Sequence, residues 1–256
     1  MMVDLNCDMG ESFGAWTMGD DEHVLPSISS ANVACGFHGG DPRVMDRTVE
    51  AAARLGIGIG AHPAFPDLVG FGRRDLAVSP DEAFTDVLYQ VGALEGFCRR
   101  HRVPMQHVKP HGQLNNLAMT RPDLAEAIVD AVYAYDPALI MVTYGGELLR
   151  AAQLRGLRIA QEVYADRAYH QSGLLVSRKV PGSVIADPEI VVQRAVRMVV
   201  ERRIESIDGG TLEIVPDTIC IHGDTPGAAS LAAQVRAGLE AAGVQVRPMK
   251  EVLSSR

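Results

Sequence analysis

Short apolar segments alternate with longer stretches of periodic hydrophobicity along nearly the whole chain. The short segments are rich in β-branched and other apolar residues, which is typical of buried strands. The longer stretches are amphipathic and predict helices, several of which begin with a proline that suits the first helical turn. Strands are predicted at 3–6, 32–35, 56–61, 105–109, 138–143, 157–162 and 217–222, with 244–247 as a candidate eighth. Helices are predicted at 42–55, 80–100, 122–135, 146–155, 188–203 and 228–242.

The alternation of strands and helices predicts βα units around a parallel sheet. Seven or eight such strands in 256 residues favour a closed α/β barrel, with residues 1–256 forming a single domain. An open, doubly wound sheet has the same local pattern and is the alternative. Two segments, 63–79 and 164–187, are longer than ordinary connections and are candidates for lids, binding loops or partner contacts. Residues 206–211 resemble a hairpin turn.

Composition narrows the classes of partner. A formal net charge of -8 argues against nucleic acid, because binding a polyanion normally needs a clustered basic surface. No apolar run approaches the roughly 18 to 20 residues that span a bilayer. The first residues lack the basic and apolar regions of a signal peptide, so a cytoplasmic location is expected. The four cysteines contain no CxxC pair, which argues against a zinc ribbon or a disulfide framework. Cys7 and Cys35 fall near strand ends, but buried packing is favoured over a nucleophilic function.

Polar residues recur where the predicted strands end. In a barrel these ends converge on one face, where catalytic residues sit. A single structural histidine would be unremarkable, but several at corresponding positions predict a common pocket. The residues concerned are Asn6, Asp8, His38, His62, Lys109, His111, Glu162, Asp166, His222 and Asp224.

Three of these side chains, Asp8, His62 and His111, could hold a divalent metal with open positions for water and substrate. Their wide spacing provides no local metal-binding signature such as HExxH. The competing interpretation is that they bind the substrate and move protons without a metal.

Nucleotide and serine-hydrolase motifs are absent from the sequence. The run 56–60 is not GxGxxG, since residue 61 is Ala61, and no GxxxxGK[ST] or GxSxG occurs. Its glycines are expected to allow close packing of a strand. Arg73 and Arg74 follow a Gly-Phe-Gly turn and could bind a carboxylate, although such a pair also suits a salt-bridged loop.

Several blocks, taken in order, resemble the LamB/YcsF family over nearly the whole chain. They are DLNCDMGE at 4–11, ANVACGFH at 31–38 with GDP at 40–42, GAHP at 60–63, PDL at 66–68, GFGRR at 70–74, VKPHG at 108–112, ADRAY at 165–169 and CIHGD at 220–224. The family often has HGALYN where this chain reads HGQLNN at 111–116, so Gln113 and Asn115 alter a potential pocket wall.

The resemblance implies a distorted (β/α)7–8 barrel similar to the glycoside hydrolase and deacetylase superfamily. It also implies a component of ATP-dependent 5-oxoprolinase, which opens the lactam of 5-oxo-L-proline to give L-glutamate with two companion subunits, of B and C type. The ATP chemistry is expected in those companions, because this chain has no recognisable phosphate loop. Homo-oligomerisation is left open.

Residue roles follow on that hypothesis. Asp8, Glu11 or His62 would position or deprotonate water, while Lys109 and His111 would stabilise negative charge and donate a proton. The substrate would be bound or oriented by a second set, with Arg73, Arg167 and Arg178 as further candidates for its carboxylate. That second set is Asn6, His38, Arg74, Glu162, Asp166, His222 and Asp224.

Two alternatives remain from the sequence. One is a metal-dependent carbohydrate deacetylase or hydrolase with Asp8, His62 and His111 as ligands. The other is a non-catalytic subunit or small-molecule carrier that shapes a partner's active site.

Overall fold

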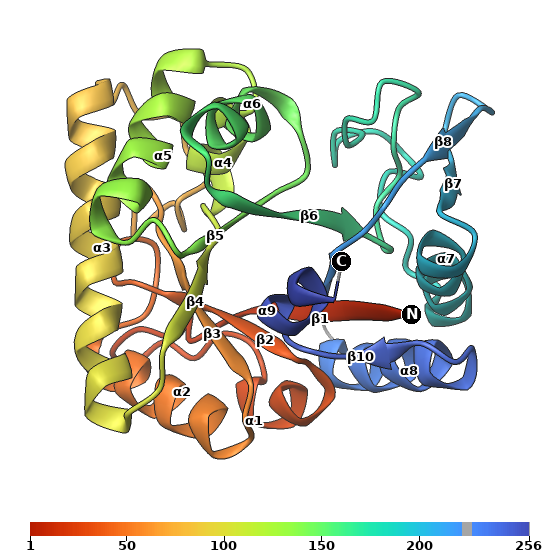
Figure 1. Ribbon diagram of the computed structural model, residues 1–256, viewed down its shortest axis with the longest axis horizontal. Helices are drawn as coiled ribbons and strands as arrows, with labels where there is room; N and C mark the ends of the chain where they lie inside the picture. Colours follow the sequence, from red (N-terminus) through yellow and green to blue (C-terminus); the bar gives the residue numbers. More distant parts are fainter. Residues whose placement is uncertain (222–226, 256) are drawn as a thin grey trace.

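The computed structural model describes residues 1–221 and 227–255, and at its centre the strands form a closed parallel barrel (Figure 1). Each strand pairs with the next one along the chain from β1 to β6, and β9 closes the ring by pairing with both β6 and β1. The closed barrel confirms the predicted fold and excludes the open sheet. The barrel strands are β1 (Met2–Met9), β2 (Ser30–Ala34), β3 (Gly58–His62), β4 (Met105–Val108), β5 (Ile140–Thr143), β6 (Arg158–Tyr164) and β9 (Thr218–Ile221).

Three further strands lie outside this ring. The candidate eighth strand forms β10 (Gln245–Val246), which pairs only with the first residues of β1 and is no part of the ring. The expected hairpin is present as β7 (Arg203–Glu205) and β8 (Thr211–Glu213), which pair antiparallel. The helix predicted to run through residue 203 therefore ends earlier, at Val200, because the chain is extended again from Arg203.

The helices surround the strand ring, with α2, α3, α5 and α6 packed in succession on one side and α7 against α8 on the other (Figure 1). Local signals explain where several of them begin. The Asp41 carboxylate caps α2, and Ser79 forms a reciprocal capping box with Glu82 at the start of α3. The helices are α1 (Asp21–Val24), the 3-10 turn η1 (Leu25–Ser27), α2 (Pro42–Arg54), α3 (Pro80–His101), α4 (Gly112–Ala118), α5 (Pro122–Tyr135), α6 (Gly146–Arg155), α7 (Pro188–Val200), α8 (Ala228–Ala241) and α9 (Met249–Ser254).

The two faces of β1 show how the barrel separates its apolar and polar cores. Leu5 and Cys7 face outward into the main hydrophobic cluster under the helices. Asp4 and Asn6 alternate with them and face the barrel interior, where both are fully buried. Asp4 accepts hydrogen bonds from the flanking strands β2 and β9, and Asn6 donates to Glu162 on β6. At the end of the barrel where strands begin, Met249 of α9 packs with interior residues of β5 and β6. The polar interior therefore opens toward the carboxyl ends of the strands.

The glycine-rich run on β3 has the structural function expected of it. A Cβ at Gly60 would lie 2.2 Å from the ring of His107, and one at Gly58 would lie 1.9 Å from the Gln106 amide nitrogen. The side chains of His107 and Gln106 both cross the glycine positions of β3 to reach β2. Nε2 of His107 lies 2.7 Å from the amide oxygen of Asn32, and the Gln106 amide donates to a serine hydroxyl on the same strand.

Candidate active site

A cavity of about 240 Å³ lies at the carboxyl ends of the barrel strands. Asp8, His62 and Lys109 form its floor, and each lies at or beside the end of β1, β3 or β4. The volume is below the roughly 300 Å³ at which pockets for drug-sized ligands begin, so a small polar substrate is the better fit. The wall residues include Arg73, His111, Gln113, Asn116, Tyr144, Tyr164, Arg167, Leu175 and Arg178.

A buried lysine lies between two carboxylates at the cavity floor. Nζ of Lys109 is 2.9 Å from Oδ1 of Asp8 and 2.9 Å from Oε1 of Glu162. Burial alone would lower the pKa of Lys109, but the acidic groups around it, Asp8 first, raise it well above its usual range. Burial would raise the pKa of Asp8, but His62 and Lys109 hold it well below its usual range. Lys109 therefore stays an ammonium and Asp8 a carboxylate.

A chain of amide side chains supports this floor from inside the barrel. The Asn6 amide donates to Oε1 of Glu162 at 3.0 Å, and its oxygen accepts from the Asn32 amide at 2.7 Å. The Asn32 amide also donates to Oδ1 of Asp8 at 2.8 Å. Burial lowers the pKa of His107 to about 3, so this histidine is neutral beside Asn32. These contacts hold both carboxylates in place and engage only Oδ1 of Asp8, whereas Oδ2 lies 3.4 Å from Nε2 of His62.

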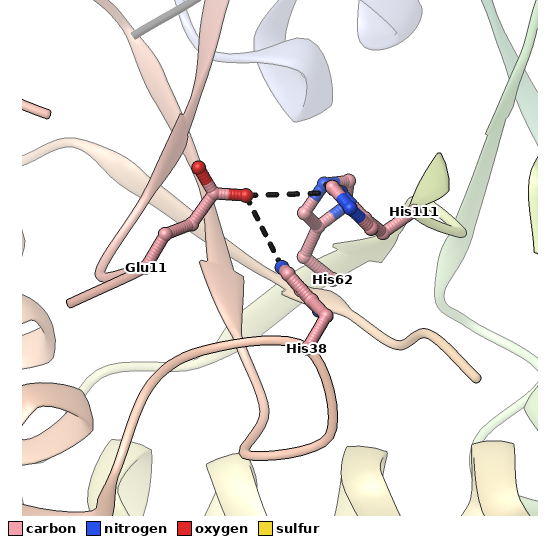
Figure 2. A group of neighbouring side chains, drawn as sticks. All are labelled: Glu11, His38, His62 and His111. Carbon is pink, nitrogen blue, oxygen red and sulfur yellow. Dashed lines mark hydrogen bonds and ion pairs between the residues drawn. The ribbon is translucent and has the colours of Figure 1, made fainter. Parts of the chain in front are cut away.

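Four buried side chains form a second group beside Asp8, which we call the histidine–glutamate cluster: Glu11, His38, His62 and His111 (Figure 2). His62 ends β3, Glu11 and His38 follow β1 and β2, and His111 directly precedes α4. Nε2 of His38 lies 3.1 Å from Oε1 of Glu11, and Nδ1 of His111 lies 3.0 Å from Nε2 of His62. The rings of His38 and His111 stack with centroids 3.8 Å apart. One ligand atom from each residue lies within 4.8 Å of the others, so the cluster could hold a metal ion.

Burial also sets the charge of this cluster. It lowers the pKa of His111 to about 3 and, together with the neighbouring imidazoles, lowers that of His38 well below its usual range. Both rings are therefore neutral and can offer lone pairs.

The structure brings together most of the residues predicted from the sequence. Asp8, His62, Lys109 and His111 face the cavity, and Asn6, Glu11, His38 and Glu162 contact them from behind. Arg74 lies apart from the cavity lining and pairs with the Asp67 carboxylate, and the half-buried Asp166 is not among the lining residues either. His222 and Asp224 lie outside the described residues.

Two of the three metal ligands predicted from the sequence belong to this cluster. His62 and His111 belong to the cluster as predicted, but the carboxylate that joins them is Glu11, with His38 as a further imidazole. Asp8 is adjacent, with Oδ2 3.4 Å from Nε2 of His62.

Two tyrosines of the cavity wall were missed by the sequence reasoning. The hydroxyl of Tyr164 donates to Oε2 of Glu162, two residues earlier on the same strand, and Tyr144 directly follows β5. The period of two along a strand could have identified Tyr164, because residues 162 and 164 must share one face.

The cysteines near the site are packed as expected. Cys7 and Cys35 are fully or almost fully buried, and burial raises the pKa of Cys35 to about 12 and that of Cys7 well above its usual range. Neither thiol is set up as a nucleophile.

The fold and the site define a β/α-barrel protein in which carboxylate, imidazole and ammonium groups meet at the carboxyl ends of the strands, as in barrel enzymes. More specifically, the chain belongs to the LamB/YcsF family, whose sequence profile matches residues 3–254. This confirms the resemblance carried by the sequence blocks.

Similar proteins cover almost the entire chain. A protein of Syntrophobacter fumaroxidans, named as the A-type subunit of 5-oxoprolinase, is 52% identical over 250 residues, which are 97% of this chain and 99% of the relative. A Thermus thermophilus protein of the same name is 50% identical over 96% of this chain and 99% of its own. The crystal structure of a lactam utilization protein from Thermus thermophilus superposes with a TM-score of 0.94 at 49% identity, covering 96% of this chain and 99% of that one.

More distant structures share the fold alone. The T48 deacetylase superposes with a TM-score of 0.51 at 14% identity, over 99% of this chain and 91% of the other. This likeness shows that the two chains share a barrel fold. Within residues 1–221 and 227–255, no helix combines the length and apolar character that crossing a membrane requires.

Proposed function

We propose that the chain is the ring-opening component of a 5-oxoprolinase, a hydrolase that converts 5-oxo-L-proline to L-glutamate. One observation carries this proposal, namely about 50% identity over nearly the full length of both chains to relatives named as the A-type subunit of 5-oxoprolinase. The small polar cavity is consistent with such a substrate.

The A-type designation of these relatives implies further subunits. We propose two companions, of B and C type, and coupling to ATP hydrolysis in the cytoplasm. A lactam is a stabilised amide, so water opens it more readily once the ring has been activated. The companions would transfer the terminal phosphoryl group of ATP to the lactam oxygen, because this chain has no GxxxxGK[ST] sequence.

In the barrel, water then adds to the former carbonyl carbon of the phosphorylated ring. Asp8 is the base in this proposal, because it lines the cavity and its Oδ1 is held by Lys109 and Asn32, which leaves Oδ2 to accept the proton. The C–N bond then breaks. The ring nitrogen takes up the proton that Asp8 accepted, and the added hydroxyl releases its own proton to Asp8 as it becomes the carbonyl group. The product is an acyl phosphate, and a second water converts it to glutamate and phosphate.

Lys109 acts as a positioning residue in this scheme. Its ammonium already has acceptors on Asp8, Glu162 and Cys220, so it orients the base instead of meeting the substrate. The roles predicted for Glu11 and His111 in proton transfer, and for Asn6 and Asp166 in substrate binding, stay predictions.

The deciding experiment measures glutamate and ADP formed from 5-oxoproline and ATP by this chain, by the companion subunits and by the mixture. Glutamate from the mixture only, and its loss on Asp8→Asn but not on the exposed control Asp123→Asn, is the expected result. If the mixture forms no glutamate where a known 5-oxoprolinase does, the proposal fails. Release of acetate from an N-acetylated sugar without ATP would instead support a carbohydrate deacetylase.

A further inference from the structure

Two imidazoles of the histidine–glutamate cluster are each held by a main-chain carbonyl oxygen, so that their other ring nitrogens face each other. Nδ1 of His62 lies 2.7 Å from the carbonyl oxygen of Lys109, and Nε2 of His111 lies 2.9 Å from that of Phe71. A carbonyl oxygen can only accept, so those two nitrogens carry the ring protons. The remaining nitrogens, Nε2 of His62 and Nδ1 of His111, lie only 3.0 Å apart, and in two neutral rings both would be lone pairs.

Two lone pairs at that distance repel each other unless a positive centre lies between them. A shared proton would satisfy that one pair of nitrogens, but it would leave the rest of the cluster unexplained. Oε1 of Glu11 is 3.7 Å from Nδ1 of His111, and Nε2 of His38 is 3.1 Å from the same oxygen. Nδ1 of His38 is buried with no hydrogen-bond partner among the described residues, so this ring interacts through Nε2. Four ligand atoms therefore converge at this point, whereas a shared proton would bind only two of them.

The spacing of the donors suits a transition-metal ion. Bonds of about 2.0–2.1 Å in a tetrahedral zinc site put neighbouring ligand atoms about 3.3 Å apart. Three of the separations, 3.0, 3.1 and 3.7 Å, lie near that value, and all four ligand atoms lie within 4.8 Å of one another. Histidine ligands of metals usually donate their second ring nitrogen to a carbonyl or carboxylate, as His62 and His111 do here.

We propose that Glu11, His38, His62 and His111 bind one divalent transition-metal ion of the Zn²⁺ class. Three imidazoles and one carboxylate favour such an ion over Mg²⁺ or Ca²⁺, which take oxygen ligands. Four protein ligands make a closed site of the structural kind. The ion would tie the segments after β1 and β2 to the end of β3 and the start of α4, beside the cavity. This inference does not depend on the substrate.

The test uses the full chain stripped of metal with a chelator and then titrated with Zn²⁺ alone. We expect one ion per chain by calorimetry and by elemental analysis. At a free Zn²⁺ concentration about 100-fold above Kd, the Tm should rise by about 5–10 °C. Fewer than about 0.2 ions per chain, or no change in Tm, would overturn the proposal in favour of a shared proton.

Variants separate the proposed ligands from their neighbours. Glu11→Gln and His38→Gln should each weaken Zn²⁺ binding at least tenfold, because each removes one ligand. The matched control His23→Gln, at an exposed histidine paired with Asp20, should bind as the unmodified chain does. Asp8→Asn should also retain Zn²⁺ binding. If this variant instead lost Zn²⁺ binding, Asp8 would replace Glu11 in the ligand set and the proposed site would be refuted.

A measurement on the unmodified chain covers the case in which a variant fails to fold. In an imidazole ¹H–¹⁵N spectrum recorded during the Zn²⁺ titration, three ring systems should change together and saturate at one equivalent. Changes confined to exposed rings such as His23 or His170 would contradict the site. All of these readouts are independent of 5-oxoproline turnover, so they can fail while the proposed function stands.

Discussion

Nδ1 of His62 donates a hydrogen bond to the main-chain carbonyl oxygen of Lys109, with 2.7 Å between the two atoms. The side chain of the same lysine meets Asp8 at 2.9 Å, so Lys109 orients both an imidazole and a carboxylate of the site. A substitution of Lys109 retains the main-chain carbonyl that accepts from His62, but it removes the ammonium that contacts Asp8. The two effects can therefore be separated by mutation.

Lys109→Met should retain the bond to His62 but leave Asp8 and Glu162 buried without their shared cation. Removing one partner of a buried ion pair costs roughly 3–5 kcal/mol, so the free energy of unfolding should fall by about that amount. Glutamate formation by the assembled subunits should fall at least 100-fold, since Asp8 loses its orientation. Urea unfolding and product assays measure both effects. Lys179→Met, at an exposed lysine, is the control, and equal behaviour of the two variants would refute the positioning function.

Gly60→Ala should destabilise the barrel through His107, because the new methyl group would fall within 2.2 Å of that ring. Moving the ring breaks its buried contact with Asn32, so we expect a loss of roughly 2–4 kcal/mol in the free energy of unfolding. In contrast, Gly92→Ala on α3 meets no atom within 4 Å and should stabilise the helix by about 0.5–1 kcal/mol. Chemical denaturation of both variants is the measurement. If Gly60→Ala left the free energy of unfolding unchanged, the His107 ring would be able to reach Asn32 by another path.

Asp4 should make the barrel less stable as pH rises. Burial raises the pKa of this fully buried carboxyl from 3.8 to about 6, so the folded state binds the extra proton between those values. Its contribution is complete below pH 4 and is lost as pH rises through 6, by about 3 kcal/mol at most. Asp4→Asn cannot titrate, so Tm measured from pH 4 to 7 should fall less steeply than in the unmodified chain. Parallel curves for the two proteins would show that Asp4 is ionised throughout.

The local hydrophobic pattern was sufficient to predict the barrel strands, but it did not determine how many strands close the ring. Residues 244–247 have the same apolar character as a barrel strand, and only their pairing with Met2 and Val3 places them outside it. Strand ends also located Asp8, His62 and Lys109, because parallel strands bring their carboxyl ends to one face.

Contacts made by loops could not be read in this way. The approach of Glu11 to His38 depends on the path of two connecting segments, where Gly40 donates its N–H to the Ser12 carbonyl oxygen. Periodicity contains no information on such a path, so the sequence suggested Asp8 as the carboxylate partner of His62 and His111.

The sequence alone also could not show which of two adjacent arginines faces the cavity. Arg73 lies in the cavity wall with its guanidinium carbon 4.9 Å from the Phe71 ring centroid, whereas Arg74 turns away to Asp67. If the proposed substrate carboxylate binds here, Arg73→Ala should raise KM for 5-oxoproline at least tenfold with Tm unchanged. Arg74→Ala should lower Tm, because the Asp67 carboxylate loses its ion pair. Its KM for 5-oxoproline should stay near that of the unmodified chain. Steady-state kinetics of the reconstituted complex and thermal unfolding distinguish the two. A raised KM in Arg74→Ala alone would assign the carboxylate to Arg74, as first expected from the sequence, and would require the loop to rearrange when substrate binds.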